Sequence, residues 1–262
     1  MDFAARYGPW ALVTGASSGL GACFARDLAG RGLDLVLVAR RADRLEALAA
    51  ELEREHGRSV RSLPMDLCAE DAAEALHRGC DGLEIGLLVN NAGFGATGAF
   101  LADDPDRDAR MVRLNCEAVV RTSHLFLPAM AERGRGGMVV VASTASFQPC
   151  PWMAVYGATK AFDLHLAEAL AVELEPRGVD VLAVCPGHTD TEFHAIAGVK
   201  GPVAGGSADP AAVVKGALDR LGRRQTWVPG WLNRCMSWAP RFGPRRLTAR
   251  LTGRLLASRM IA

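Results

Sequence analysis

The 262-residue chain lacks the sequence features of a membrane-spanning, secreted or metal-binding protein. No stretch reaches the roughly 18 consecutive apolar residues that indicate a transmembrane helix. Residues 1–6 do not begin the charged-then-apolar pattern of a signal peptide, so we expect a cytoplasmic protein. The seven cysteines include no C-x-x-C pair, and the histidines form no cluster at ligand spacing. The sequence therefore predicts neither disulfides nor a metal site.

Acidic residues are nearly absent from the C-terminal part of the chain. Residues 215–262 hold eleven lysines and arginines but one acid, Asp219, whereas the remainder holds 19 basic and 28 acidic residues. Such asymmetry is typical either of a segment that contacts an anionic partner or of a solvated helix face. Nucleic-acid binding is not expected, because the basic excess is confined to the tail and no recognition motif accompanies it.

Short apolar runs alternate with helical patterns along the chain. Continuously apolar runs such as 34–39 are typical of strands covered by helices on both faces. The pattern predicts an α/β fold in which one doubly wound parallel sheet binds its ligand at the carboxyl ends of the strands. Strands are expected at 10–14, 34–39, 60–65, 85–90, 138–143, 179–185 and 226–228, and helices near 19–31, 43–56, 69–79, 107–133, 155–176 and 209–222.

A glycine-rich turn, Thr14-Gly-Ala-Ser-Ser-Gly-Leu-Gly21, joins the first expected strand to the first expected helix. Glycines allow a tight turn and close backbone approach, and a helix start offers N–H donors to a pyrophosphate. The spacing alone is weak evidence, and its position directly after a strand makes it informative. We expect a dinucleotide to contact Gly15, Ser17, Ser18, Gly19, Leu20 and Gly21.

The second expected strand ends in Ala39-Arg40-Arg41 rather than in an acid. An acid here would bind the ribose 2′-hydroxyl of NAD, whereas an arginine accommodates the 2′-phosphate of NADP. The alternative is two solvated arginines at the start of a helix. We expect Arg40 to favour NADP(H). Further candidates follow the third and fourth strands, where an adenosine would rest: Asp66, Leu67, Asn90, Ala92 and Gly93.

Tyrosine and lysine are rare, with two and three residues, yet Tyr156 and Lys160 lie four positions apart. On a helix this spacing places both side chains on one face. A nearby ammonium favours the phenolate, which would pull the pKa of the tyrosine from about 10 toward neutral pH and make it a general acid or base. The alternative is a surface pair in which the lysine stem stacks on the ring. Ser143, at the end of the fifth strand, can present its hydroxyl to the same cleft.

Together these motifs resemble the short-chain dehydrogenase/reductase family, and in particular its NADP-preferring ketoreductases, over about residues 8–192. The resemblance rests on the glycine-rich turn, residues 90–93, Asn115, Ser143, Tyr156, Lys160 and Pro186-Gly187, in family order and at family-like spacing. It implies a Rossmann-type fold and one NADP-binding domain over residues 1–262.

The resemblance also implies a role for each matched residue. Tyr156 would donate a proton to a substrate carbonyl, and Lys160 would lower the pKa of Tyr156 and hold the nicotinamide ribose. Ser143 would hydrogen-bond the substrate oxygen, and Asn115 would position a water for proton relay. The nicotinamide end of the cofactor would contact Pro186, Gly187 and Thr189.

We therefore predict an oxidoreductase that transfers a hydride between NADP(H) and a small-molecule carbonyl or alcohol. A non-enzymatic dinucleotide sensor or scaffold on the same fold is the alternative. The family commonly pairs subunits through helices near 107–133 and 155–176, which implies a homodimer or homotetramer. Apolar candidates around the mouth indicate a substrate with a hydrophobic body: Phe94, Phe147, Trp152, Phe193 and Ile196.

The family match fades beyond about residue 225, so residues 225–262 are interpreted as a basic C-terminal extension. Leu247, Leu251 and Leu255 recur on one face of an expected helix, with arginines elsewhere on the wheel. This face should be buried against the substrate pocket, a sister subunit or a membrane surface. We favour docking on the protein itself, with weak membrane contact as the alternative.

Overall fold

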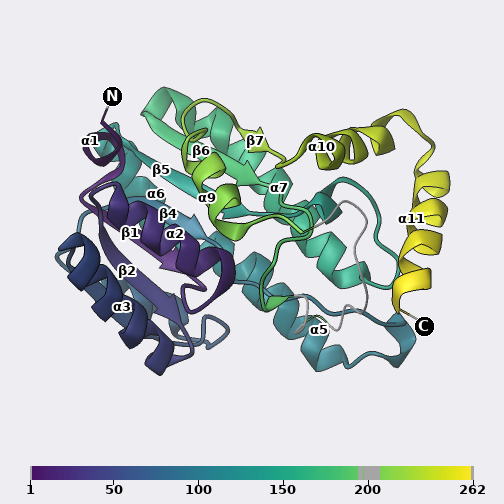
Figure 1. Cartoon of the computed structure of the whole chain (residues 1–262), viewed down its shortest axis with the longest axis horizontal. Coiled ribbons are helices and arrows are strands. Elements are labelled where there is room, and N and C mark those ends of the chain that lie inside the picture. The colour runs from purple at the N-terminus through teal and green to yellow at the C-terminus, as the bar shows by residue number, and fades with distance from the viewer. Residues whose placement is uncertain (1, 194–196, 198–206, 261–262) are drawn as a thin grey trace.

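The computed structural model describes residues 2–193, 197 and 207–260, and within them seven strands form one parallel sheet (Figure 1). The strand order is β3-β2-β1-β4-β5-β6-β7. The strands are β1 (Trp10–Thr14), β2 (Asp34–Ala39), β3 (Val60–Pro64), β4 (Ile85–Asn90), β5 (Gly136–Val141), β6 (Val179–Val184) and β7 (Thr226–Trp227). This architecture confirms the predicted fold class.

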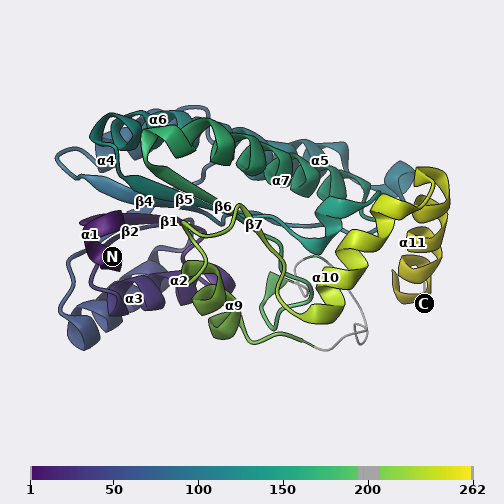
Figure 2. The same ribbon diagram turned by 90° about the horizontal axis from the view of Figure 1, so that it is seen from above.

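Helices cover both faces of the sheet, as Figure 2 shows. One face carries α2 (Gly19–Gly30), α3 (Ala42–His56) and α9 (Pro210–Leu218), and the other carries α4 (Ala72–Gly79), α5 (Pro105–Val112), α6 (Ala118–Arg133) and α7 (Ala154–Leu174). Strand β2 sends Leu35 and Leu37 into one apolar core and Val36 and Val38 into the other. This double burial explains why the strands are apolar at consecutive positions.

The remaining elements are short or lie outside the sheet layers. A short helix, α1 (Phe3–Tyr7), precedes β1, and 3-10 turns occur at η1 (Phe100–Ala102), η3 (Thr144–Phe147), η4 (Glu175–Arg177) and η5 (Ala239–Phe242). Within the described residues, no helix is long and apolar enough to cross a bilayer.

Several predicted boundaries differ from the structure by one or more residues, and two of the differences have a clear physical reason. Strand β5 begins at Gly136, two residues before the expected start, because glycines do not register as an apolar run. Gly137 has a packing reason: a Cβ there would lie 3.0 Å from the ring of Tyr7. The helix expected near 107–133 is α5 and α6 joined by a π-helical turn, η2 (Arg113–Glu117). Such turns are frequent at functional sites.

The chain order reverses between β1 and β4, which are neighbours in the sheet. In open α/β sheets this reversal leaves a crevice at the carboxyl ends of the strands. The hydroxyl of Thr14, the last residue of β1, accepts hydrogen bonds of 3.0 Å from the backbone N–H groups of Asn91 and Ala92. The crevice is therefore fixed at its centre by β1 and the segment after β4.

The basic extension forms α10 (Trp231–Trp238) and α11 (Arg245–Met260), beyond the carboxyl ends of the strands in Figure 1. The expected helix is present and docks on the body of the protein, but not through its leucine face. Leu247, Leu251 and Leu255 are 51%, 50% and 63% exposed. The helix turns a different side, with Thr252 and Leu256, toward the body of the protein.

Candidate active site

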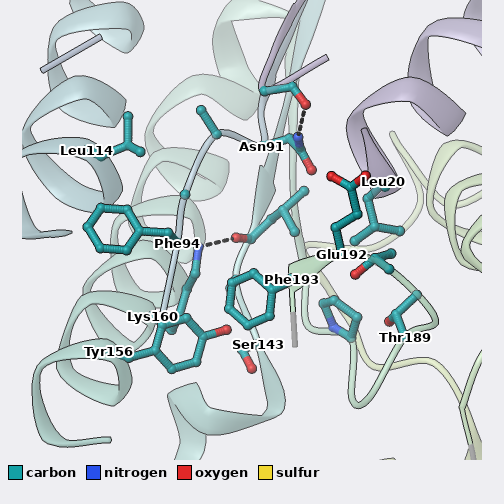
Figure 3. Close-up of a pocket in the computed structure, with 18 of the residues that line it drawn as sticks. Leu20, Asn91, Phe94, Leu114, Ser143, Tyr156, Lys160, Thr189, Glu192 and Phe193 are labelled. Atoms are coloured by element: carbon teal, nitrogen blue, oxygen red, sulfur yellow. Dashed lines mark hydrogen bonds between the residues drawn. The ribbon is translucent and has the colours of Figure 1, made fainter. Parts of the chain in front are cut away.

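A cavity of about 500 Å³ opens at the carboxyl ends of β1 to β6. Figure 3 shows Tyr156, Lys160 and Ser143 at one side of it and Leu20 and Thr189 at the other. The predicted site residues line this cavity with three exceptions, which are Gly21, Asn90 and Asn115. Residues scattered from position 15 to position 189 of the sequence thus meet at one place.

The glycine-rich turn has the backbone that its sequence predicts. Gly15 and Gly19 have φ of +68° and +54°, where side chains are strained. A Cβ at Gly21 would lie 2.1 Å from the Gly15 carbonyl oxygen, so Gly21 lets the turn close and does not line the cavity. Helix α2 begins at Gly19, which places its positive N-terminal end beside the cavity.

Two neighbouring arginines have different surroundings at the mouth of the cavity. Arg41 donates to the hydroxyls of Ser17 at 3.0 Å and Ser18 at 2.7 Å, and it pairs with Glu192 at 3.0 Å. Hydrogen bonds from Arg44 and Arg41 lower the pKa of Glu192. Arg40 lines the same cavity and is exposed. The sequence prediction named Arg40 alone and missed Arg41, although the adjacent arginine and the serine pair were visible signals.

Asn90 does not line the cavity, contrary to the prediction. As the last residue of β4 it is buried, and its Oδ1 accepts a 2.8 Å hydrogen bond from the Thr122 hydroxyl on α6. The next residue faces the opposite way: Asn91 lines the cavity and donates to the Thr14 carbonyl at 2.8 Å. The sequence could not show which asparagine of the pair lines the cavity, because that depends on the direction in which each side chain leaves the end of β4.

The residues expected near an adenosine do line the cavity. Asp66 and Leu67 follow β3, and Ala92 and Gly93 follow β4. The carboxylate of Asp66 pairs with Arg110 of α5, a partner that the sequence did not indicate. The ion pair ties this part of the rim to α5.

Asn115 lies in the π-helical turn and is fully buried behind the cavity. Its side chain accepts from the Phe94 N–H at 3.1 Å and donates to the Thr159 hydroxyl at 3.0 Å. A Cβ at Gly93 would lie 3.0 Å from the Asn115 Oδ1 and 3.5 Å from the Lys160 Nζ. Asn115 is therefore separated from the Lys160 ammonium by Gly93. Its side chain links α7 to the segment after β4.

Tyr156 and Ser143 approach each other from α7 and from the end of β5, and Figure 3 shows the tyrosine hydroxyl directed toward Ser143. Burial raises the pKa of Tyr156 above its ordinary value near 10, while the charge of Lys160 and a hydrogen bond with Ser143 work to lower it. The expected fall of this pKa toward neutral pH is therefore wrong. At neutral pH the phenol carries its proton and can donate it.

The Lys160 ammonium is buried and donates hydrogen bonds to two acceptors, a carbonyl on β5 and a carboxylate on its own helix. It donates to the Val141 carbonyl at 2.7 Å and to the Asp163 carboxylate at 3.0 Å. Burial by itself would lower the pKa of Lys160, but the negative charge of Asp163 holds it above its ordinary value. The sequence analysis missed Asp163, although its i, i+3 spacing from Lys160 was visible.

The segment after β6 forms the wall opposite α7. Pro186, Gly187 and Thr189 line the cavity as predicted. A Cβ at Gly187 would lie 2.6 Å from the side-chain nitrogen of Asn233, so this glycine allows α10 to pack closely against the site. The C-terminal extension thereby contacts the segment expected to hold the nicotinamide.

The walls near Tyr156 are largely apolar. Of the five apolar candidates, Phe94 and Phe193 line the cavity, Phe147 and Trp152 do not, and Ile196 lies outside the described residues. Trp152 instead donates from its indole nitrogen to the Gly253 carbonyl at 3.2 Å, which holds α11 in place. Residues that sequence reasoning missed complete this part: Leu114, Gln148, Cys150, Met153, Thr252 and Leu256.

Comparisons with known proteins agree on one family. The family model for short chain dehydrogenase matches residues 9–198. The chain is 34% identical to a 7beta-hydroxysteroid dehydrogenase of Clostridium sardiniense, covering 89% of this chain and 90% of the relative. It is 32% identical to the very-long-chain 3-oxoacyl-CoA reductase of Homo sapiens, covering 82% and 69%.

Solved structures of similar proteins give the same result. A short-chain dehydrogenase from Sphingobium yanoikuyae in complex with NADPH superposes with a TM-score of 0.80 at 38% identity, covering 86% of this chain and 89% of that one. A 7beta-hydroxysteroid dehydrogenase superposes with a TM-score of 0.88 at 27% identity, covering 97% and 100%.

Proposed function

The chain belongs to the short chain dehydrogenase family, and on this basis we propose that it transfers a hydride between NADP(H) and a carbonyl or alcohol whose body is apolar. The observation that carries the proposal is the meeting of Tyr156, Ser143 and Lys160 in a cavity that also includes the glycine-rich turn. A scaffold or sensor would need the turn but not the proton donor.

The residues present fit a dinucleotide. The turn from Gly15 to Gly21 leaves room for close backbone approach, and the start of α2 favours an anionic group. Arg40 and Arg41 at the mouth suit a 2′-phosphate, and the Sphingobium relative carries NADPH. When bound, NADPH supplies the hydride that is added to the carbonyl carbon.

Tyr156 on α7 and Ser143 just after β5 act on the substrate oxygen, to which a proton must be delivered. Tyr156 donates its phenolic proton to the oxygen as negative charge develops there, and the Ser143 hydroxyl hydrogen-bonds the same atom. Lys160 offers its ammonium to the ribose next to the nicotinamide, and Asn115 supports the relay of protons behind it. In the reverse direction Tyr156 must first lose its proton, which its raised pKa disfavours near neutral pH.

The proposed activity is tested by following the oxidation of NADPH with a panel of ketones, aldehydes, quinones, steroids and acyl thioesters. We expect turnover with at least one bulky apolar carbonyl, and faster turnover with NADPH than with NADH. Tight NADPH binding without turnover on any member of the panel would favour the sensor or scaffold instead.

The assembly and the cellular location of the protein are inferred from its sequence and its resemblance to the family. A homodimer or homotetramer through α5, α6 and α7 is our proposal for the assembly, supported by the half-exposed apolar side chains of Val112 on α5 and of Phe162 and Val172 on α7. A cytoplasmic location remains a prediction of the sequence.

The exposed face of α10 and α11 is a proposed contact with an anionic membrane surface. Trp231 of α10 is 76% exposed, Phe242 of the intervening η5 is 84% exposed, and the leucines of α11 are exposed as well. No acid follows Asp219 in the sequence, so the arginines on the other sides of these helices have no acidic residue in the same segment. Pairing two copies through this face would bring arginines together, whereas an anionic lipid surface complements the charge.

We expect the protein to bind vesicles that contain phosphatidylglycerol more strongly than vesicles of phosphatidylcholine alone, and less strongly as salt rises. Sedimentation with vesicles measures this, and Arg246→Glu/Arg250→Glu should abolish it. Arg54→Glu, an exposed position on α3, is the matched control and should bind normally. A variant that binds vesicles unchanged but has a smaller mass in solution would assign the face to a second copy instead.

A further inference from the structure

Asp163 is a buried carboxylate that the roles proposed above do not use. It lies seven residues after Tyr156 and three after Lys160 on α7, so the three side chains share one side of the helix. The side chain of Asp163 is 1% exposed and that of Lys160 is 7% exposed. A carboxylate in such surroundings is costly unless it is paired.

Of the two carboxylate oxygens of Asp163, one accepts a hydrogen bond and the other accepts none from the described residues. Oδ2 accepts from the Lys160 ammonium at 3.0 Å, whereas Oδ1 is buried without a hydrogen-bond partner among the described residues. If Asp163 served only the stability of the helix, an apolar side chain of similar size would stabilise this position equally well. The half-satisfied carboxylate therefore points to a role that needs its charge.

The ammonium of Lys160 is directed by its two acceptors. It donates to the Val141 carbonyl, while Figure 3 shows the hydroxyl of Tyr156 pointing toward Ser143. In the described part of the chain, three thiols also lie around the pair: Cys116 of η2, Cys150 after η3 and Cys185 at the end of β6. Burial raises the pKa of Cys116 and Cys150 to about 11 and that of Cys185 further, so these thiols are neutral near neutral pH. Among the described residues, Lys160 and Asp163 are therefore the charged side chains that act on Tyr156. Burial raises the pKa of Asp163, and the adjacent Lys160 ammonium works against that rise and favours the carboxylate.

Their effects on the phenol are opposite. The positive charge of Lys160 lowers the pKa of Tyr156, and the negative charge of Asp163 raises it. Burial already favours the neutral phenol of Tyr156. When the negative charge of Asp163 offsets the positive charge of Lys160, little remains to favour the phenolate, and Tyr156 keeps its proton.

We propose that Asp163 is a positioning residue of this site: its carboxylate anchors the Lys160 ammonium and balances its charge, which keeps Tyr156 protonated as the proton donor. The inference rests on the proposed function for the role of Tyr156, but the charge balance exists in the protein without substrate or cofactor. It assigns this enzyme a bias toward carbonyl reduction near neutral pH, because alcohol oxidation needs the ionised tyrosine.

Asp163→Asn tests the proposal, since the amide keeps the size of the side chain and an acceptor for Lys160 but removes the charge. Tyr156 should then ionise about one pH unit lower or more, because the field of Lys160 is no longer balanced. The loss of reduction activity at high pH should move down by the same amount, and alcohol oxidation below that pH should increase. Asp163→Glu restores the carboxylate. It should return the pH at which reduction is lost, and the pH at which oxidation begins, toward the wild-type values.

Two readouts separate this inference from the proposed activity. The first is the pH dependence of kcat/KM in each direction. The second is the ultraviolet absorbance of tyrosinate in the cofactor-free protein, measured in a Tyr7→Phe background so that Tyr156 is the one tyrosine left. If no carbonyl is ever reduced, the proposed function fails while the absorbance titration still tests Asp163.

The chain contains a matched control. Asp180 accepts a 2.8 Å hydrogen bond from the Tyr7 hydroxyl and pairs with Arg6 at 2.9 Å, a second tyrosine, cation and carboxylate cluster outside the cavity. Asp180→Asn, made in the chain that retains Tyr7, should leave the kinetic pH profile unchanged. A folded Asp163→Asn variant whose Tyr156 titrates as in the wild type would overturn the proposal. If Asp163→Asn does not fold, Asp163→Thr replaces it, and the failure of both to fold would make the role of Asp163 purely structural and overturn the proposal too.

Discussion

Tyr156→Phe is expected to lower the turnover of ketone reduction by about two orders of magnitude or more, the usual contribution of a positioned general acid. The phenylalanine keeps the ring, which is buried beside Phe193 with centroids 5.5 Å apart, and removes the hydroxyl that faces Ser143. The affinity for NADPH should change little, because the glycine-rich turn and the arginines are untouched. Steady-state kinetics and a direct NADPH titration measure the two quantities.

Tyr7→Phe provides the control for Tyr156→Phe. Tyr7 is the other tyrosine of the chain, and its hydroxyl bonds to Asp180 outside the cavity. Its loss should lower stability without changing turnover. If the Tyr156→Phe variant keeps activity within about threefold of the wild type, a role for Tyr156 as proton donor is wrong.

The sheet could be predicted from the sequence because its strands are buried on both faces. Residues 10–14, 34–39 and 85–90 were predicted with the bounds that the structure has, since a run of apolar residues between helical patterns has few other interpretations. The parallel order followed from the alternation of strands and helices. The family, the fold class and the oxidoreductase class are thus confirmed predictions, whereas the roles of individual site residues remain predictions.

The errors concern the direction in which a side chain faces. Asn90 and Asn91 are adjacent, and only the register of β4 decides that the second reaches the cavity. The leucine face of α11 was the side expected to dock on the protein, yet within this chain Thr252 and Leu256 face the cavity instead. The spacing of apolar residues predicts that a helix has an apolar face. What that face packs against depends on contacts between segments that are distant in the sequence.

The pKa of Tyr156 shows a second limit. The sequence revealed the nearby lysine but not the burial of the phenol or the balancing carboxylate of Asp163. Both depend on how α7 packs against β5 and η2. The spacing of Tyr156 and Lys160 therefore predicted that the two side chains lie at one cavity, but not the direction in which the pKa of Tyr156 is shifted.

Arg40→Ala is expected to weaken NADPH binding far more than NADH binding. A charge-assisted hydrogen bond to the 2′-phosphate contributes roughly 1.5–3 kcal/mol, which corresponds to a loss of about 10- to 150-fold in affinity for NADPH. NADH has no phosphate at this position, so its affinity should stay within about twofold. Fluorescence titration with each cofactor gives the four dissociation constants that the comparison needs.

Arg41→Ala distinguishes the two neighbouring arginines. Arg41 is already engaged by Ser17, Ser18 and Glu192, so a phosphate must compete with Glu192 for it, whereas Arg40 is exposed at the cavity mouth. We therefore expect Arg41→Ala to weaken NADPH binding less than Arg40→Ala does, and Arg54→Ala on α3 to have no effect. A wild-type protein that prefers NADH would contradict the assignment of Arg40, and so would a large loss of NADPH affinity in Arg41→Ala with none in Arg40→Ala. In the second case the phosphate displaces Glu192, and Arg41 is the residue that selects NADP(H).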